Sequence, residues 1–191
     1  MGQVRRPPGA RRAALLSAAL LSAALLLTLA ACTGEDDDRA ADAPSASFTA
    51  NGVAVTLRVT AWDGRHGTLT ADFVPQEPGF HLYSVDLPPE GIDGIGRPTS
   101  VAVLGSLRAH GKLTADAPVR RIPSPGTEET LPVYPDGPVT TTLPLTADGP
   151  GPASVSVGYA LCNATEGCML PVDDHRVPLT VTEQGISFTG N

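Results

Sequence analysis

The sequence predicts an all-β protein, an antiparallel immunoglobulin-like sandwich of about seven to nine strands that spans residues 47–191. Two observations support this fold class. Apolar and polar residues alternate in short segments throughout the region, and prolines or glycines separate the segments. No segment after residue 46 shows a sustained helical period. A region of about 145 residues has the size of a single domain.

The clearest strand covers residues 53–61, where valine and leucine alternate with alanine, threonine and arginine. A turn at Asp63-Gly64 separates it from a second alternating segment at 69–73. The remaining segments with the composition of strands are 80–87, 99–104, 119–122, 139–145, 153–161 and 176–182.

One connection is longer than the others. Residues 123–138 are rich in proline, glycine and acids, and they also carry Leu131, Val133 and Tyr134. Long loops in compact domains are usually functional or disordered. The apolar side chains could cover a small site, and a solvated connector is an equally good interpretation of the composition.

Residues 1–31 have the features of an export signal. Four arginines precede an apolar run at 13–30, and the run leads into Leu29-Ala30-Ala31-Cys32, which is similar to a bacterial lipobox. We therefore expect removal of residues 1–31 and lipid attachment at Cys32. A transmembrane helix is the alternative, but the run is rich in alanine and acids follow it rather than basic residues.

Residues 32–46 follow the expected cleavage point. They contain several acids and no large apolar side chain, so they cannot bury enough surface to fold. We expect a flexible tether that begins at the lipidated cysteine. The folded domain would then be held by its lipid at the extracytoplasmic face of the cell membrane.

Charge and motifs exclude several functions. The chain carries 13 basic and 20 acidic residues, and loss of residues 1–31 would leave nine basic ones. No basic patch remains to neutralise phosphates, so we expect no nucleic-acid partner. Hydrolase motifs are absent, and we expect no cofactor. We also expect no metal: Cys162, Cys168 and His175 could supply three ligands, but five residues between the cysteines is not a usual zinc spacing.

Cys162 and Cys168 are the only cysteines besides Cys32, and a pair in an exported domain is expected to form a disulfide. Closing so short a loop stabilises a fold by roughly 2–2.5 kcal/mol, which is little for a domain of this size. Disulfides in accessible loops also exchange readily. From the spacing alone, a structural disulfide and a redox-active one both remain possible.

Three segments together resemble the N-terminal periplasmic domain of the transmembrane thiol–disulfide reductase DsbD. The specific one is the cysteine segment, Tyr159-x-x-Cys162-x5-Cys168-x-x-Pro171, followed by a Val-Pro-Leu strand at 177–179. Residues 78–83 (PGFHLY) are similar to the family's Gly-Tyr-x-Leu-Tyr strand, and residues 142–145 (TLPL) to its Leu-Pro strand. The resemblance extends over roughly residues 47–183.

The resemblance implies a function in extracytoplasmic electron transfer. Such a domain receives electrons from a membrane redox hub and passes them to thioredoxin-like or other disulfide-bearing proteins outside the cytoplasm. Cys162 and Cys168 would be the redox pair, with Tyr83 and His81 near it in the neighbouring strand and Tyr159 and Pro171 flanking it. The family's aromatic-tipped cap loop would have its counterpart in the stretch from Leu131 to Tyr134.

The sequence also departs from the family. Met169-Leu170 stands where the family tends to have an aromatic residue, and the family's acidic-aromatic cap sequence is not recognisable. We expect a free-standing domain that is tethered by lipid and supplied with electrons by a separate membrane protein. A lipid-anchored immunoglobulin-like binding module, in which the disulfide only fixes a recognition loop, is the competing hypothesis.

Overall fold

The computed structural model describes residues 43–124, 126 and 128–189. The predicted signal peptide, the lipidation site Cys32 and most of the predicted tether lie outside these residues. The described residues form fifteen strands. They are β1 (Ser45–Ala50), β2 (Val53–Thr60), β3 (His66–Pro75), β4 (Phe80–Leu82), β5 (Ser100–Gly105), β6 (Leu107–Ala109), β7 (Thr114–Ala115), β8 (Arg120–Pro123), β9 (Thr130–Val133), β10 (Val139–Ala147), β11 (Gly151–Tyr159), β12 (Leu161–Asn163), β13 (Gly167–Cys168), β14 (Val172–Val181) and β15 (Ile186–Phe188).

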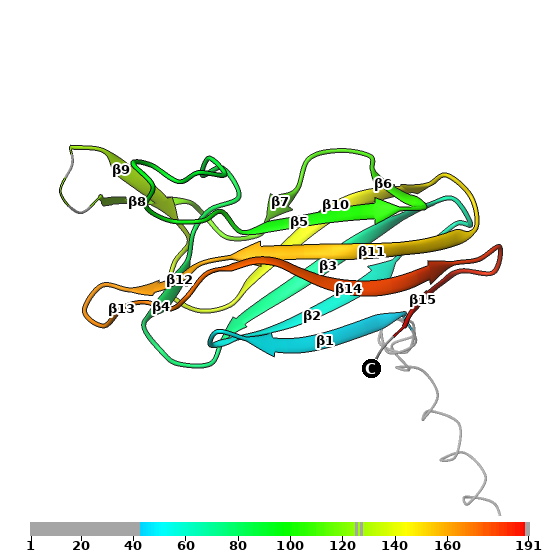
Figure 1. Ribbon diagram of the computed structural model, residues 1–191, viewed down its shortest axis with the longest axis horizontal. Helices are drawn as coiled ribbons and strands as arrows, with labels where there is room; N and C mark the ends of the chain where they lie inside the picture. The colour runs from blue at the N-terminus through cyan, green and yellow to red at the C-terminus, as the bar shows by residue number, and fades with distance from the viewer. Residues whose placement is uncertain (1–42, 125, 127, 190–191) are drawn as a thin grey trace, which may run out of the picture. The chain divides into compact units, whose positions relative to one another are not determined.

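Two antiparallel sheets form the body of the domain (Figure 1). The larger has the order β1-β2-β3-β10-β6, with β7 also paired to β10, and the smaller has the order β15-β14-β11-β5. Two further small sheets, β13-β12-β4 and β8-β9, lie together at one end of the sandwich (Figure 1). The predicted all-β antiparallel sandwich is therefore confirmed.

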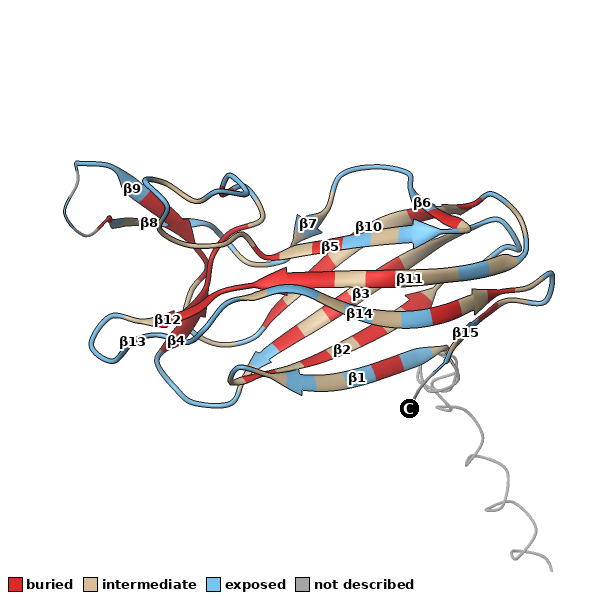
Figure 2. Cartoon of the chain, in the orientation of Figure 1, coloured by how far each residue is buried: buried red, intermediate tan, exposed pale blue. Residues whose placement is uncertain are grey.

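Alternating burial of the long strands builds the core. In β2 and β10 every second residue is buried and the residues between them are partly exposed, as expected for strands with one face against a core (Figure 2). The buried side chains of the two large sheets form a single apolar cluster, in which Leu57, Leu69, Phe73, Val155 and Leu179 are 2% exposed or less. Apolar burial at about 25 cal/mol per Å² is the main force that holds the two layers together.

Seven strands have six residues or more, and six of them, β2, β3, β5, β10, β11 and β14, match predicted segments, whereas β1 was not predicted. Of the eight shorter strands, β4 and β8 overlap the predicted segments 80–87 and 119–122, and the other six have two to four residues, too few to show an alternating pattern. β1 begins at Ser45 and buries Ala46, so the folded domain reaches two residues into the predicted tether. β4 ends at Leu82, five residues before the predicted end, because residues 84–87 form a turn in which Ser84 O accepts a hydrogen bond from Leu87 N.

The segment 123–138 is not a long loop. Its first half closes the β8–β9 hairpin, in which Ile122 pairs with Leu131 and Arg120 with Val133. This hairpin and the small sheet beside it enclose a second apolar cluster, separate from the main core. Among the described residues no helix is long and apolar enough to cross a membrane.

Candidate functional site

A bend in one strand carries the first cysteine out of the main sheet. The pairing of β11 with β14 shifts between Val157 and Tyr159, where Gly158 lies opposite two residues of β14, Asp173 and Asp174, so the extra residue of this irregularity is on β14. A Cβ atom at Gly158 would lie 2.7 Å from the Ser100 side chain and 3.0 Å from a backbone oxygen, so the close approach of three strands requires glycine there. Beyond this irregularity the chain continues as β12 and pairs with β4.

Cys162 and Cys168 face each other across the β12–β13 hairpin and form a disulfide bond. The side chain of Asn163 shapes the turn between them, because its Oδ1 accepts hydrogen bonds from the backbone N of Thr165 and Glu166, at 2.8 and 3.2 Å. The two sulfurs differ in access. Cys162 is 5% exposed, whereas Cys168 belongs to an exposed strand at the surface. A partner molecule can therefore reach Cys168 far more readily than Cys162.

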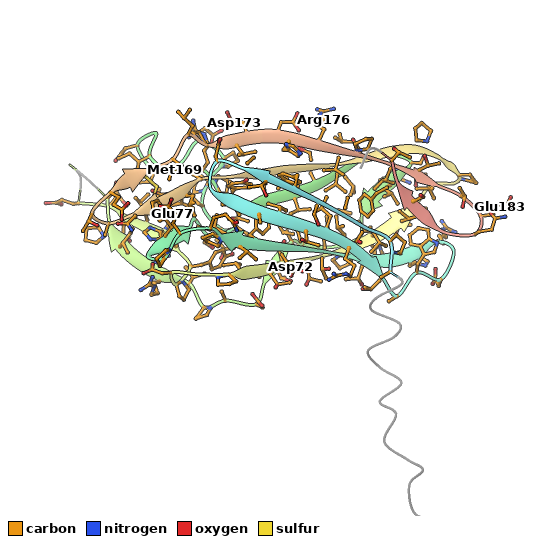
Figure 3. All side chains as sticks on the ribbon, turned by 90° about the horizontal axis from the view of Figure 1, so that it is seen from below. Asp72, Glu77, Met169, Asp173, Arg176 and Glu183 are labelled. Atoms are coloured by element: carbon orange, nitrogen blue, oxygen red, sulfur yellow. A yellow bond between two sulfur atoms is a disulfide. The ribbon has the colours of Figure 1, made fainter. Side chains whose placement is uncertain are left out.

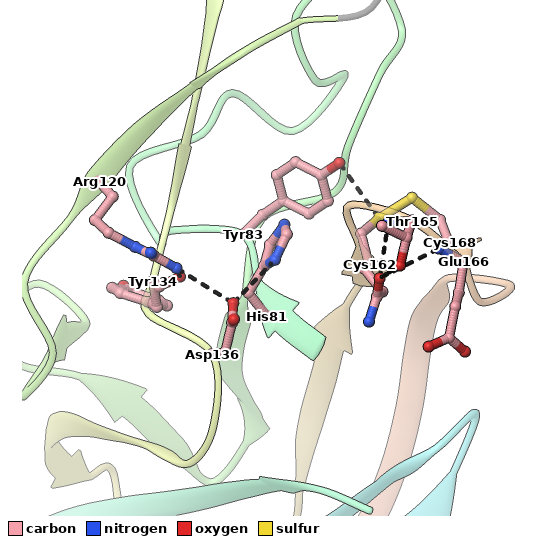
Figure 4. Close-up of polar contacts among 10 residues, drawn as sticks. His81, Tyr83, Arg120, Tyr134, Asp136, Cys162, Thr165, Glu166 and Cys168 are labelled. Atoms are coloured by element: carbon pink, nitrogen blue, oxygen red, sulfur yellow. Dashed lines mark hydrogen bonds and ion pairs between the residues drawn. A yellow bond between two sulfur atoms is a disulfide. The ribbon is translucent and has the colours of Figure 1, made fainter. Parts of the chain in front are cut away.

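Tyr83 provides the polar contact to the buried sulfur. Its hydroxyl donates a hydrogen bond to Cys162 Sγ at 3.4 Å (Figure 4). The ring is 3% exposed, and burial raises the pKa of Tyr83 above its ordinary value. The phenol therefore stays protonated at neutral pH and can stabilise a thiolate that forms at Cys162.

A chain of polar groups lies beside Tyr83. His81 pairs with Cys162 through the backbone, and its Nδ1 is 3.4 Å from Asp136 Oδ1, which also accepts a hydrogen bond from Arg120 at 3.2 Å (Figure 4). Burial lowers the pKa of His81, and the nearby carboxylate of Asp136 opposes that effect only in part. His81 Nε2 is buried and has no hydrogen-bond partner among the described residues.

The second apolar cluster contains Cys162 and Tyr83. Its buried members are Tyr83, Leu87, Leu131, Val133, Ala160 and Cys162, with Ile92, Ile95 and Ile122 packed against them. Leu131 of the β8–β9 hairpin therefore packs in the same cluster as Cys162 and Tyr83. Ile92 and Ile95, from a second segment at residues 91–97, also pack against this cluster. The sequence did not predict a role for that segment.

Tyr134 does not cap the site. It is 1% exposed, belongs to the main core, and its hydroxyl accepts a hydrogen bond from Val85 N at 3.0 Å. Tyr134 directly follows β9, three residues after Leu131, so in an extended chain its side chain points to the opposite face and enters the main core instead of the cluster that holds Leu131 and Val133. Tyr159 is likewise a core residue: it packs against Phe73, donates a hydrogen bond to Ala50 O at 2.7 Å, and burial raises its pKa to about 12.

A cavity of about 210 Å³ opens beside the disulfide. Its lining consists of Tyr83, Gly94, Ile95, Gly96, Arg97, Ala160, Cys162, Cys168, Met169 and Pro171. A larger cavity of about 350 Å³ lies among the turns at 64–65, 147–150 and 181–183, and it contains no cysteine or aromatic side chain. The smaller cavity is therefore the chemically relevant one. Figure 3 shows Met169 at the opposite end of the domain from Glu183, a residue of the larger cavity.

The rim of the smaller cavity is apolar on one side and charged on the other. Met169 and Leu170, which directly follow Cys168, are 37% and 80% exposed. Across the cavity Arg97 lies 3.8 Å from Asp173, which ties the segment 91–97 to the start of β14. Exposed methionine and leucine beside an exposed sulfur are typical of a surface that contacts another protein.

Most of the predicted site residues therefore lie together. Cys162, Cys168, Tyr83, His81 and Leu131 form one compact group, and Pro171 lines the cavity beside it. Asp136 and Arg97 were missed, since no local pattern points to either residue. The pair of isoleucines in the Gly-rich stretch at 91–96 was a signal that could have been used.

A metal site is not formed by the described residues, in which no three histidine, cysteine or acidic side chains gather in a suitable group. His175, the third ligand considered above, stacks instead on Phe48, with 3.6 Å between the ring centroids.

Comparison with known proteins identifies the fold. No family model and no curated protein matches the sequence. Among solved structures, the N-terminal periplasmic domain of ScsB from Proteus mirabilis matches with a TM-score of 0.50 at 9% identity, over 78% of this chain and 54% of that one. The reduced N-terminal domain of DsbD from Neisseria meningitidis matches with a TM-score of 0.44 at 13% identity, over 73% of this chain and 91% of that one.

The class defined by these observations is an all-β domain with a disulfide at one end of a sandwich. Its fold is similar to that of the N-terminal periplasmic domain of ScsB, in agreement with the all-β sandwich that the sequence predicted. At identities this low the likeness concerns the fold, and the chemistry has to be argued from the residues of this chain.

Proposed function

We propose that this domain performs thiol–disulfide exchange at Cys162 and Cys168. The observation that carries the proposal is the unequal environment of the two sulfurs, with Cys168 exposed and Cys162 buried against the Tyr83 hydroxyl. Exchange needs one sulfur that a partner can attack and a second that can leave as a stabilised thiolate. A disulfide that served only as a staple would gain nothing from this difference.

The exchange proceeds in two steps. A thiolate of the electron donor attacks Cys168 Sγ and forms a mixed disulfide, and Cys162 departs as a thiolate that receives the Tyr83 hydrogen bond. A second donor thiolate then attacks the donor sulfur of the mixed disulfide and expels Cys168. The donor leaves as a disulfide, and the pair has gained two electrons and two protons. The same steps in reverse pass the electrons to an oxidised acceptor.

The surface favours proteins as the physiological partners. Small thiols need only an accessible sulfur, but Met169 and Leu170 present apolar surface directly beside Cys168. A partner with an apolar rim around its own cysteine would bury this surface on docking. Thioredoxin-like proteins and other disulfide-bearing proteins outside the cytoplasm are the partner class that we infer, with a membrane redox hub as the donor.

Two observations support a location outside the cytoplasm. The ScsB domain with the same fold is periplasmic. Together with the lipobox-like sequence ending at Cys32, this supports export, lipidation at Cys32 and attachment to the outer face of the cell membrane. Residues 32–44 would act as the tether.

Trapping of a mixed disulfide tests the exchange. Cys162→Ala leaves the exposed Cys168 as the only thiol of the site, and Cys168→Ala leaves the buried Cys162, both in a chain from residue 33 onward. We expect the first variant to form a mixed disulfide with oxidised thioredoxin many times faster than the second. Equal and slow trapping by both variants would favour the binding-module hypothesis, with a purely structural disulfide.

A further inference from the structure

The β1–β2 turn packs against the β12–β13 hairpin that carries the two cysteines. Asn51 and Gly52 form this turn with φ angles of 44° and 81°, in the left-handed region that asparagine and glycine tolerate best. The side-chain Nδ2 of Asn51 donates a hydrogen bond to Leu170 O at 2.8 Å and approaches Pro171 O at 3.4 Å. These two residues directly follow Cys168 and Met169, although 119 positions separate Asn51 from Leu170.

Two further contacts join the same turn to the other half of the hairpin. Tyr159 donates its hydroxyl hydrogen bond to Ala50 O at 2.7 Å, next to Asn51. A Cβ atom at Gly52 would lie 3.2 Å from Leu161 and 3.9 Å from Met169, so the turn packs closely against residues that adjoin both cysteines. The turn therefore contacts the segment before Cys162 and the segment after Cys168.

We propose that Asn51 is a positioning residue for the redox pair. Its amide fixes the backbone after Cys168 relative to the turn, and the Tyr159 hydrogen bond fixes the backbone before Cys162 to the same turn. This role deepens the exchange function proposed above. Asn51 contacts neither sulfur, and it acts through the carbonyl groups of Leu170 and Pro171.

The effect is greatest in the reduced state. In the oxidised protein the covalent bond itself holds Cys168 beside Cys162. After reduction only non-covalent contacts keep the two thiols together, and the equilibrium between dithiol and disulfide depends on their effective concentration. Loss of the Asn51 hydrogen bond lets the residues after Cys168 move more freely, which lowers that concentration. The disulfide then becomes easier to reduce.

The test replaces the amide without disturbing the turn. Asn51→Gly keeps a residue that accepts positive φ and removes the donor, whereas Asn51→Asp keeps the shape and sets a carboxylate against two carbonyl oxygens. A matched control is Asp63→Gly in the β2–β3 turn, where the Asp63 carboxylate accepts hydrogen bonds from the backbone N of Arg65 and His66. This control removes a turn side chain that makes no contact with the cysteine hairpin.

Each protein, as the chain from residue 33 onward, is equilibrated in dithiothreitol redox buffers, and the fraction oxidised is measured by thiol alkylation. Urea unfolding of the oxidised proteins is measured in parallel. Because Asn51→Gly removes one hydrogen bond, we expect it to shift the equilibrium toward the dithiol by about threefold to tenfold. A tenfold shift corresponds to a change of about 30 mV in the reduction potential. Asn51→Asp is expected to shift it at least as far, and Asp63→Gly by less than twofold.

Two results would overturn the inference: an equilibrium constant for Asn51→Gly equal to that of the parent protein, or an equal shift in Asp63→Gly. If Asn51→Gly does not fold, Asn51→Asp decides in the same way. The outcome is separable from that of the proposed function, because dithiothreitol reports the equilibrium even for a structural disulfide. A parent protein that never exchanges with oxidised thioredoxin refutes the function alone.

Discussion

Replacing Tyr83 by phenylalanine removes the hydroxyl that contacts Cys162 Sγ and keeps the buried ring. When an external thiolate attacks Cys168, negative charge develops on Cys162, and Tyr83 is the neighbour that donates a hydrogen bond to that sulfur. We therefore expect Tyr83→Phe to slow reduction of the disulfide while leaving the fold intact.

The size of the effect follows from the contact. A hydrogen bond to a charged group contributes about 1.5–3 kcal/mol net. The 3.4 Å distance and the incomplete charge in the transition state place this contact at the lower end of the range or just below it. Since about 1.4 kcal/mol corresponds to a factor of ten in rate, we expect reduction to slow about tenfold.

Stopped-flow measurement of reduction by dithiothreitol provides the assay. Tyr134→Phe is the control, because it removes a buried tyrosine hydroxyl that accepts a hydrogen bond from Val85 N, away from the disulfide. That variant should lose stability by about 1–3 kcal/mol and keep the parent rate. A parent rate for Tyr83→Phe, or equal slowing in both variants, would refute the assignment of Tyr83.

Three other predictions test separate parts of the site. Because burial lowers the pKa of His81, the folded protein binds fewer protons than the unfolded chain below about pH 6.5, so stability against urea should fall as the pH drops from 7.5 to 5. His81→Gln should make stability depend less on pH. Asp136→Asn should make it depend more on pH, because Asp136 raises the pKa of His81. Unchanged pH profiles in both variants would show that His81 does not cause the loss of stability at low pH. Leu170→Ser should slow exchange with oxidised thioredoxin by about threefold to tenfold and leave the reaction with oxidised glutathione unchanged. If the variant and the parent protein react with oxidised thioredoxin at the same rate, Leu170 is not part of a docking surface. Simultaneous replacement of Cys162 and Cys168 by alanine should cost about 2–2.5 kcal/mol and lower Tm by roughly 5–10 °C with the fold retained, whereas complete unfolding would identify a structural staple.

The sequence predicted the sandwich because its long strands have one buried face. In β2 and β10 buried and partly exposed residues alternate without interruption. This pattern alone predicts both the strand conformation and the face of the strand that lies against the core. Most of the short strands could not be predicted in the same way. β12 and β13 have three and two residues, and they form where the chain beyond β11 leaves β14 and pairs with β4.

The sequence predicted only those residues of the site that belong to a recognisable local pattern. The cysteine pair followed from the cysteine count and the export signal, Tyr83 and His81 followed from the resemblance to known segments, and the structure brings them together. Asp136, Arg97 and Asn51 reach the site through contacts between strands or loops far apart in sequence, which no local pattern encodes. Tyr134 was misplaced because composition does not show which residues of a hairpin point into the core.

The reduction potential of Cys162 and Cys168 distinguishes a working redox pair from a structural disulfide. The measurement uses the chain from residue 33 onward and is combined with melting curves of the oxidised and reduced forms. For a redox pair we expect a potential between about −200 and −270 mV, with both forms folded. A potential below about −300 mV, with the reduced form unfolded, would contradict it and identify the disulfide as structural.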